Sequence, residues 1–343
     1  PGIPDPGLQV MQGSGMPGAE SFSMNIRGIG TLNSSGPLVL VDGMEQSIAF
    51  VNPADIANVS VLKDAASCAI YGNRGANGVI LITTKNGSKD GKVSVSYDAT
   101  VSYSEPFKVI HTVSNYVDFM NLFNEAFDNV GGTHQYSDSN IALWTQASQD
   151  PNGKLNPGQK YPNYVAYPNV DWWDYIYSNK LMQQHTVSIN GKEKRTGYTM
   201  SFGFVDNPGV LNSDSGYKRF NGRINLYSDV TNWLRVGARI WGSRTNQDPN
   251  YNALDDFFTS ISTQKMVPAT YPYYDGMYGA PECEQEDPQS HNPLKTINAY
   301  NGTDYRTYIY TDWYAQVKFL KHFTYNFDYY YNDIRRERKL TSK

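Results

Sequence analysis

The side chains that usually perform catalysis or bind metals do not form any arrangement that such chemistry requires. The five histidines show no ligand spacing relative to one another, so the sequence predicts no zinc or other metal site. The chain lacks the G-x-S-x-G and H-E-x-x-H patterns, and neither cysteine lies in a nucleophile context. We therefore predict that the protein is not an enzyme and requires no cofactor.

An acidic segment with the sequence PECEQEDP is the next candidate for ligand chemistry. It carries Glu282, Glu284, Glu286 and Asp287. Carboxylate oxygens are ligands that calcium prefers, but this spacing is not that of an EF-hand loop. We expect a solvated run of charges over residues 282–287 and keep calcium binding as the alternative.

Two loop segments are rich in tyrosine. The side chains in them that could bind a substrate are Tyr161, Tyr164, Tyr167, Tyr271, Tyr273, Tyr274 and Tyr278. Aromatic rings combine a flat apolar face with a polar edge, which suits stacking against a sugar ring. For both segments we expect packing within the loops and keep substrate binding as the alternative, and we expect Trp172, just after the first segment, to be a packing residue.

Glycine-rich loops in the N-terminal part of the chain carry two arginines, Arg27 and Arg74. A buried arginine requires a carboxylate or carbonyl groups as partners, so we expect both to pair with carboxylates. The glycines from Gly72 to Gly78 match neither GxGxxG nor GxxxxGK[ST], so no phosphate site is predicted.

Composition limits the class of partner. The chain has 343 residues, a net charge of −4, 39% hydrophobic residues and 27 tyrosines. This charge gives no basic footprint, so nucleic acid is excluded as an expected partner. Cys68 and Cys283 are far apart in different contexts, so no disulfide is predicted. No run of about 18 apolar residues exists, which excludes a membrane-spanning helix but leaves a transmembrane barrel open.

Residues 1–88 are predicted to form one compact α/β unit. Pro37–Gly43 is a buried strand ending in an Asp-Gly turn, and Val59–Leu62 and Val79–Thr84 are two more buried strands. A short helix is expected over Ala65–Tyr71, with Asp64 capping its N-terminus.

From Lys92 onward, apolar and polar residues alternate with the period of a strand that has one apolar and one polar face. We predict seven strands, around residues 92–104, 185–190, 198–204, 220–226, 234–240, 309–319 and 323–331. A basic cluster, Arg335–Lys339, follows the last of these.

Short and long connections alternate between these strands, which is typical of outer-membrane barrels with short periplasmic turns. By parity, the long segments at about 105–180 and 247–305 are then extracellular. The first of them is predicted to contain one helix, Asn115–Asn129, capped by Ser114. Its apolar residues fall on one face, which we expect to pack on the barrel or on other loops. Seven strands cannot enclose an 88-residue unit, so residues 89–343 are expected to be the N-terminal part of a larger barrel.

The chain resembles the SusC/RagA-like TonB-dependent outer-membrane transporters of Bacteroidetes. The resemblance rests on IRG at 26–28, PLVLVDG at 37–43, NPADIANVSVLKDAASCAIYGNRGANGVILITTK at 52–85, and NVDWWDYIY at 169–177. It implies a membrane all-β protein: a large antiparallel barrel of 22 strands with an N-terminal α/β plug domain in its lumen. Within these motifs, the residues assigned to the plug and its gating are Arg27, Gly28, Asp42, Gly43, Lys63, Asp64, Tyr71, Gly72, Arg74, Gly75, Asn77 and Gly78.

What the resemblance implies is active import of a nutrient across the outer membrane. The expected cargo is an oligosaccharide, with a peptide as the alternative. The expected partners are a SusD-like surface lipoprotein acting as a lid, TonB with ExbB and ExbD acting through a segment before Pro1, and outer-membrane lipid. Two other classes stay open: a TonB-dependent signal-transducing receptor and a β-rich surface adhesin.

Overall fold

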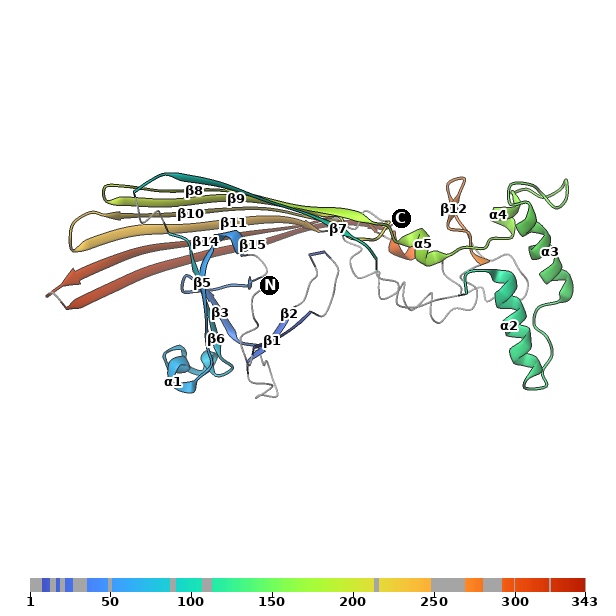
Figure 1. The fold of residues 1–343 in the computed structure, drawn as a ribbon, viewed down its shortest axis with the longest axis horizontal. Helices are drawn as coiled ribbons and strands as arrows, with labels where there is room; N and C mark the ends of the chain where they lie inside the picture. The colour runs from blue at the N-terminus through green and yellow to red at the C-terminus, as the bar shows by residue number, and fades with distance from the viewer. Residues whose placement is uncertain are drawn as a thin grey trace.

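The computed structural model describes residues 8–12, 17–18, 22–26, 36–48, 51–86, 91–106, 113–212, 216–247, 269–279, 292–298, 300–320 and 322–342. They form a long antiparallel sheet, an N-terminal unit against one face of it, and a lobe of short helices beyond one end (Figure 1). In this described part of the chain, no helix is both long and apolar enough to cross a membrane.

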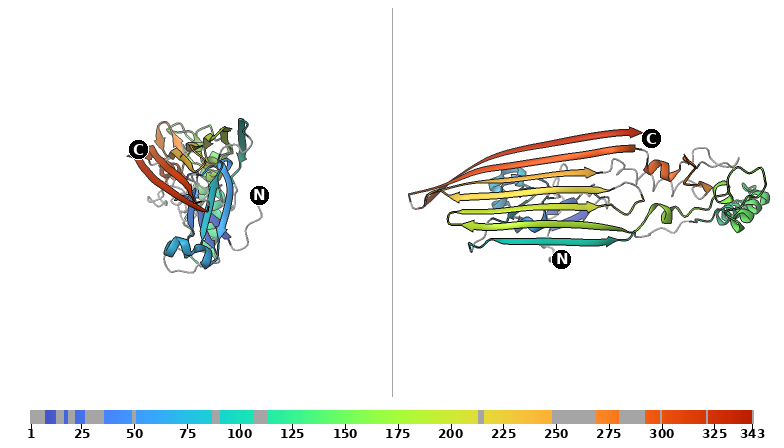
Figure 2. Two further views of the ribbon diagram at one scale, coloured as in Figure 1. Left: turned by 90° about the vertical axis from the view of Figure 1, so that its left-hand side faces the viewer. Right: turned by 90° about the horizontal axis from the view of Figure 1, so that it is seen from above.

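The long sheet contains all seven predicted strands. They are β7 (Ser94–Ser104), β8 (Lys180–Glu193), β9 (Thr196–Asn207), β10 (Tyr217–Asp229), β11 (Leu234–Gln247), β14 (Tyr300–Phe319) and β15 (Phe323–Ser342). Their order across the sheet is β15-β14-β11-β10-β9-β8-β7, and every neighbouring pair is antiparallel. Each strand therefore pairs with the next described strand of the sheet in sequence, as in an up-and-down barrel wall (Figure 2).

Most of the strands extend beyond their predicted ends, and β8, β11, β14 and β15 do so by five residues or more. β8 begins at Lys180, before the predicted start at His185, and β15 continues through Arg335–Lys339 to Ser342. The basic cluster is therefore part of a strand. Alternation of polarity ends where both faces of a strand become polar, whereas backbone pairing with β14 continues to Ser342.

The sheet has two chemically different faces. On the face away from the N-terminal unit, called the outer face, large apolar side chains are exposed, among them Val95, Tyr97, Val101, Phe202, Ile224, Val236, Trp313, Phe327 and Tyr329. On the opposite, inner face, the buried side chains are mainly polar, among them Thr186, Ser201, Asn221, Arg223, Asn225 and Asp312. Because side chains alternate along a strand, the period-two pattern of the sequence separates these two faces.

The apolar part of the outer face runs obliquely across the strands. One row of paired residues crosses all seven strands through Ala99, His185, Phe204, Phe220, Arg244, Thr307 and Arg335. On β7 the apolar side chains continue past this row to Tyr103, and the next outer-face residue is Glu105. On β15 they end before this row, at Tyr331, and the next outer-face residue is Asp333. The end of the apolar region is therefore displaced by about eight residues, at ~3.3 Å per residue, between β7 and β15. Because these two strands are six spacings of ~4.8 Å apart, strands that keep the apolar region level in a membrane would tilt by about 40°. Strands of transmembrane barrels tilt by about 35–45°.

The N-terminal unit is a small mixed sheet with a hairpin beside it. The sheet order is β4 (Met44–Glu45), β3 (Leu38–Val41), β6 (Val79–Thr84) and β5 (Ile56–Leu62), in which β3 and β6 are parallel. The hairpin is β1 (Leu8–Gln12) with β2 (Phe22–Ile26). The core of the unit comprises Ile26, Val41, Val51, Ile80 and Ile82. The predicted α/β unit and its strands are confirmed, but β5 is not buried as predicted, because Val59 is 48% exposed and the rest of the strand is at most partly covered.

The predicted helix and glycine-rich loop of this unit differ in detail. Helix α1 is short (Ala65–Cys68), and the 3₁₀ helix η3 (Ala69–Gly75) follows and takes in the start of the predicted loop, with a kink at Gly72. Asp64 is at the N-cap position, but its side chain makes no capping hydrogen bond, so the predicted cap is wrong.

The lobe contains more helices than the one predicted. They are α2 (Tyr116–Asp128), α3 (Asp138–Gln149), α4 (Asn163–Ala166), α5 (Trp172–Ile176) and α7 (Pro293–Ile297), with the small hairpin β12 (Tyr273–Tyr274) and β13 (Met277–Tyr278). α3 is too polar to show a clear apolar stripe, and α4 and α5 are single turns. Asn115, and not the predicted Ser114, caps α2 by accepting a hydrogen bond from the Val117 amide at 2.9 Å.

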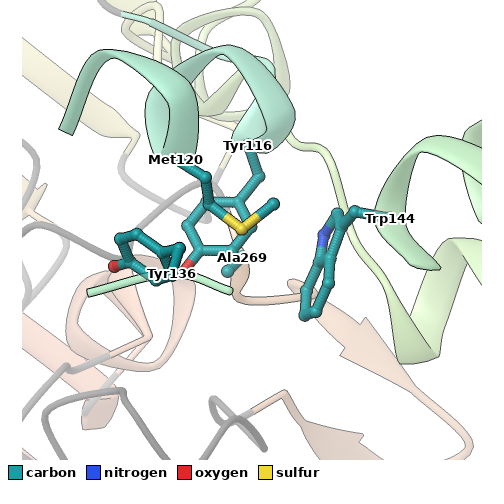
Figure 3. Packing of buried hydrophobic residues seen from close by; sticks show 5 residues of the cluster. All are labelled: Tyr116, Met120, Tyr136, Trp144 and Ala269. Carbon is teal, nitrogen blue, oxygen red and sulfur yellow. The ribbon is translucent and has the colours of Figure 1, made fainter. Parts of the chain in front are cut away.

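The core of the lobe joins segments that are distant in sequence. Tyr116 and Met120 of α2 pack with Tyr136, with Trp144 of α3 and with Ala269 (Figure 3). Tyr116 is fully buried, and its ring lies 5.1 Å from that of Trp144. The predicted apolar face of α2 is therefore used for packing inside the lobe.

Gly78 is a position where a side chain cannot be accommodated. Its φ is +93°, and a Cβ there would lie 2.7 Å from Ile26 Cδ1 and 3.2 Å from the Leu62 carbonyl oxygen. We predict that Gly78→Ala lowers the free energy of unfolding of the N-terminal unit by about 2 kcal/mol, measured by hydrogen exchange in the full-length protein. The control is Gly222→Ala, where nothing lies within 3.8 Å of the new Cβ. Equal losses in the two variants would contradict the role assigned to Gly78.

Candidate functional site

The N-terminal unit is joined to the inner face of the sheet by a buried ion pair. Asp42 begins the tight turn between β3 and β4, in which Asp42 and Gly43 both have positive φ, at 50° and 91°. The Asp42 carboxylate accepts a hydrogen bond from the Arg223 guanidinium of β10 at 2.7 Å, and both side chains are only 4% exposed. The predicted Asp-Gly turn therefore places a charge against the wall.

The same carboxylate is also bound within the N-terminal unit. Asp42 accepts hydrogen bonds from the Thr84 amide at 2.9 Å and from the Thr84 hydroxyl at 2.6 Å. Asn225, two residues after Arg223, donates in turn to the Thr84 hydroxyl at 3.0 Å and to the Lys85 carbonyl at 2.9 Å. The end of β6 and the β3–β4 turn are thus held together and held against β10.

Two further contacts extend this interface along the wall. Asn52, which also caps the 3₁₀ helix η2 (Pro53–Asp55), donates to the Thr186 hydroxyl of β8 at 2.9 Å. Met44 of β4 packs with three aromatic rings of the inner face, Trp241, Tyr308 and Tyr310. The N-terminal unit therefore contacts strands from β8 to β14 by both polar and apolar side chains.

Asp55 adds a titratable carboxyl group to this interface. Its side chain is buried, and burial raises its pKa above the ordinary value of 3.8, while the Ser201 hydroxyl and the Arg223 and Lys85 charges act in the opposite direction. Desolvation has the larger effect, so this carboxyl holds its proton to a higher pH than an exposed aspartate does.

A polar cavity of about 580 Å³ lies next to the ion pair. Asp42 lines it from the N-terminal unit, and Arg239, Tyr314 and Asp328 line it from the wall. The Arg239 guanidinium is ion-paired with Asp312 and stacks over the Tyr314 ring, 4.1 Å from its centroid. A polar space therefore lies directly beside the β3–β4 turn.

The predicted plug residues fall into three groups. Asp42 and Gly43 lie at the wall, and a Cβ on Gly43 would lie 2.8 Å from the Tyr330 hydroxyl. Tyr71, Gly75 and Gly78 contribute to packing: Tyr71 packs against the cluster formed by Leu40, Cys68 and Val79. Lys63, Asp64, Gly72 and Asn77 belong to the α1 end of the unit, which lies away from the long sheet (Figure 1).

The two arginines expected to pair with carboxylates have different outcomes. Arg74 is paired with Glu45 of β4, as expected, but the two side chains are 66% and 53% exposed, so this pair is not buried. Exposed ion pairs contribute little to stability. Arg27 and Gly28 lie outside the described residues, as does the acidic segment 282–287.

The tyrosine clusters, more than 100 residues apart in sequence, meet in the lobe. Tyr161 and Tyr164 of the first cluster contact Tyr274 of the second, with ring centroids 5.8 and 6.1 Å apart, and Tyr164 also contacts Tyr271 at 5.5 Å. Tyr161, Tyr271, Tyr274 and Tyr278 line a cavity of about 250 Å³. Burial raises the pKa of Tyr271.

The remaining tyrosines of these clusters have other surroundings. Tyr167 packs edge-on against Trp144 at 5.0 Å, and Tyr273 is half exposed and contacts Tyr278 across the hairpin. Trp172 is buried with Ile176, Leu211 and Ile297, as expected of a packing residue. Among the described residues, no group of three or more His, Cys, Asp or Glu side chains could hold a metal ion.

Sequence reasoning did not identify the wall residues that hold the N-terminal unit. Arg223, Asn225 and Thr186 are ordinary polar members of alternating strands, and nothing in their spacing distinguishes them from their neighbours. An arginine in an alternating strand could have pointed to such a residue, because a guanidinium on a covered face requires a carboxylate partner.

Loss of the Asp42 charge should loosen the N-terminal unit from the wall. Asp42→Asn leaves the Arg223 guanidinium buried without its carboxylate, which costs about 3–5 kcal/mol. We expect faster hydrogen exchange of β6 amides in the full-length protein. The matched control is Asp229→Asn, because the Asp229–Arg235 pair has the same 2.7 Å distance but is 33% and 39% exposed. This control should lose less than about 1 kcal/mol, and an equal loss in both variants would refute the importance of burial.

The Asp55 carboxyl should make the stability of the interface depend on pH. Its pKa is raised in the folded state, so the stabilisation linked to its proton is complete below about pH 3.8 and is lost as pH rises through the folded-state pKa. Asp55→Asn, which stays neutral, should gain stability relative to the unchanged protein as pH rises from about 4 to 7. Urea unfolding at several pH values measures this difference, and a difference independent of pH would contradict the prediction.

Comparison with known proteins agrees with this geometry. Residues 4–79 match the family model of the TonB-dependent Receptor Plug Domain. The chain is 34% identical over 231 residues to the TonB-dependent receptor SusC of Bacteroides thetaiotaomicron, covering 64% of this chain and 20% of SusC. It is 30% identical over 285 residues to the TonB-dependent receptor P26 of Formosa agariphila, covering 80% of this chain and 26% of that receptor.

Solved structures give the same result. The structure of the RagAB peptide transporter superposes with a TM-score of 0.71 and 26% identity, covering 93% of this chain and 37% of that chain. The RagAB peptide importer in its open-open state gives a TM-score of 0.68. The chain thus spans a fifth to a quarter of the length of these curated relatives. It belongs to the SusC/RagA-like TonB-dependent transporters, with the N-terminal unit as its plug domain and the seven-stranded sheet as part of its barrel wall.

Proposed function

We propose that the protein imports a nutrient across the bacterial outer membrane in a TonB-dependent manner. The observation that carries the proposal is the position of the plug domain, held by Asp42–Arg223 against the polar inner face of a sheet whose outer face is apolar. An oblique apolar band on one side and a polar, occupied lumen on the other fit a plugged transmembrane barrel.

The orientation follows from the connections. The β8–β9, β10–β11 and β14–β15 connections are tight and lie at one end of the sheet, whereas the lobe lies beyond the other end (Figure 2). We assign the tight turns to the periplasmic side and the lobe to the cell surface, as in other outer-membrane barrels. Residues 105–180 and 247–305 are then extracellular.

The gating step is a displacement of the plug from the wall. In this proposal, TonB with ExbB and ExbD pulls on the plug, the Asp42–Arg223 pair separates, and the adjacent polar cavity widens into a path. A buried pair suits such a gate because it is strong while dry and weakens once water enters.

The proposed cargo is an oligosaccharide. Tyr161, Tyr271, Tyr274 and Tyr278 line one cavity in the lobe, and their rings offer flat faces and hydroxyl groups. A SusD-like surface lipoprotein is the proposed lid over this end. The RagAB structures are those of a peptide transporter, so a peptide is the second candidate cargo.

Uptake in cells tests the proposal. Cells that carry the full-length protein should accumulate labelled oligosaccharide only when TonB is present, and TonB-independent uptake would refute energy-coupled import. Tyr274→Ala should weaken the apparent affinity roughly three- to tenfold because it removes aromatic stacking, whereas Tyr274→Phe keeps the ring. The matched control is Tyr273→Ala, since this neighbour does not line the cavity. Equal effects of Tyr273→Ala and Tyr274→Ala would contradict the assignment of the cavity.

A further inference from the structure

Arginines gather on the inner face of the wall at the end nearest the lobe. The register of the strands places Arg219 of β10, Arg306 of β14 and Arg336 of β15 in one row, and Arg338 in the adjacent row. Arg306, Arg336 and Arg338 are here called the arginine cluster. Their row also contains Thr245 of β11, and the adjacent row contains one carboxylate, Asp304.

One carboxylate cannot satisfy this cluster. Asp304 is fully buried and accepts hydrogen bonds from Arg336 at 2.8 Å and 2.5 Å, so both of its oxygens are engaged by a single guanidinium. Arg306 and Arg338 lie 3.8 and 4.0 Å from the same carboxylate, beyond hydrogen-bond distance. Their side chains are 30% and 38% exposed, so their guanidinium groups are accessible from the lumen.

The charge of the wall therefore changes along the lumen. Near the plug, Arg223, Arg235 and Arg239 each have an aspartate partner within 2.7 Å among the described residues. Near the lobe, Arg306, Arg336 and Arg338 lie around one aspartate, Asp304, among the described residues. A cleft lined by one sign of charge raises the local concentration of ligands of the opposite sign.

We infer that the arginine cluster binds an anionic group of the transported oligosaccharide, so that the cargo is an acidic glycan carrying carboxylate or sulfate groups. The inference rests on the proposed function and narrows its substrate class. A guanidinium donates two parallel hydrogen bonds to a carboxylate or sulfate, which gives orientation as well as attraction. The cluster lies on the inner face at the lobe end of the wall, on the side from which a glycan would enter.

Two arginines are suitable for mutation. Arg336 is unsuitable, because its removal would leave the buried Asp304 carboxylate without its hydrogen bonds. Arg306→Gln and Arg338→Gln remove charges that make no hydrogen bond to this carboxylate. The matched control is Arg335→Gln on the same strand, because Arg335 faces outward, is 72% exposed and pairs with Asp333.

The experiment measures binding of the full-length protein to a glycan array in which each acidic oligosaccharide is paired with its carboxyl-reduced or desulfated form. We expect binding to acidic members only, weakened at least tenfold between 50 and 500 mM salt by screening. Arg306→Gln and Arg338→Gln should each weaken binding about tenfold, and Arg335→Gln should not change it.

The outcomes separate the two levels of the proposal. Equal binding of acidic and neutral members, or equal losses in Arg335→Gln and Arg338→Gln, would overturn the anionic site and leave oligosaccharide import intact. Binding of no array member, acidic or neutral, would overturn the oligosaccharide cargo itself. Binding of tetraglutamate with no bound glycan would assign the cluster to an acidic peptide and would equally overturn the inference.

Discussion

The buried Asp42–Arg223 pair is the interaction on which the arrangement of this protein depends. Each of its charges is on a different domain, and neither is stable in a dry interface alone. Asp42 is also hydrogen-bonded to Thr84, so the pair connects the core of the plug to the wall. The contacts of Asn225, Asn52 and Met44 lie around it and help to keep both charges buried, and surroundings of low polarity strengthen such a pair.

The wall has to present different chemistry to two surroundings at once. Alternation along each strand sends Ile224 outward and Arg223 inward, so the same backbone supports an apolar outer face and a charged lumen. The lumen is itself divided. Among the described residues, its arginines near the plug each have an aspartate, whereas Arg306, Arg336 and Arg338 near the lobe have Asp304 in common. One sheet therefore both holds the plug in place and carries the arginine cluster at its lobe end.

The lobe shows how a surface for ligands is assembled without regular sheet structure. Its core, around Tyr116 and Trp144, is as well buried as that of the plug and gives short helices a fixed position. Tyrosines from segments on opposite sides of four wall strands then line one cavity. Sequence patterns suggested a ligand role for each segment separately, and the contact of Tyr164 with Tyr271 and Tyr274 unites them.

The sequence by itself determined the elements whose signal is local. Seven alternating strands, the Asp42–Gly43 turn, the strands of the plug and the apolar face of α2 all follow from short-range periodicity and turn chemistry. It could not identify α3, whose side chains are mostly polar, or the extension of β15 through Arg335, because pairing with β14 decides both faces there. Only the tertiary structure selected Arg223 among the inward polar residues and grouped Arg306, Arg336 and Arg338 around Asp304. The reason is physical: a charge is costly or useful according to its partner, and these partners lie between about 30 and 180 residues apart in the chain.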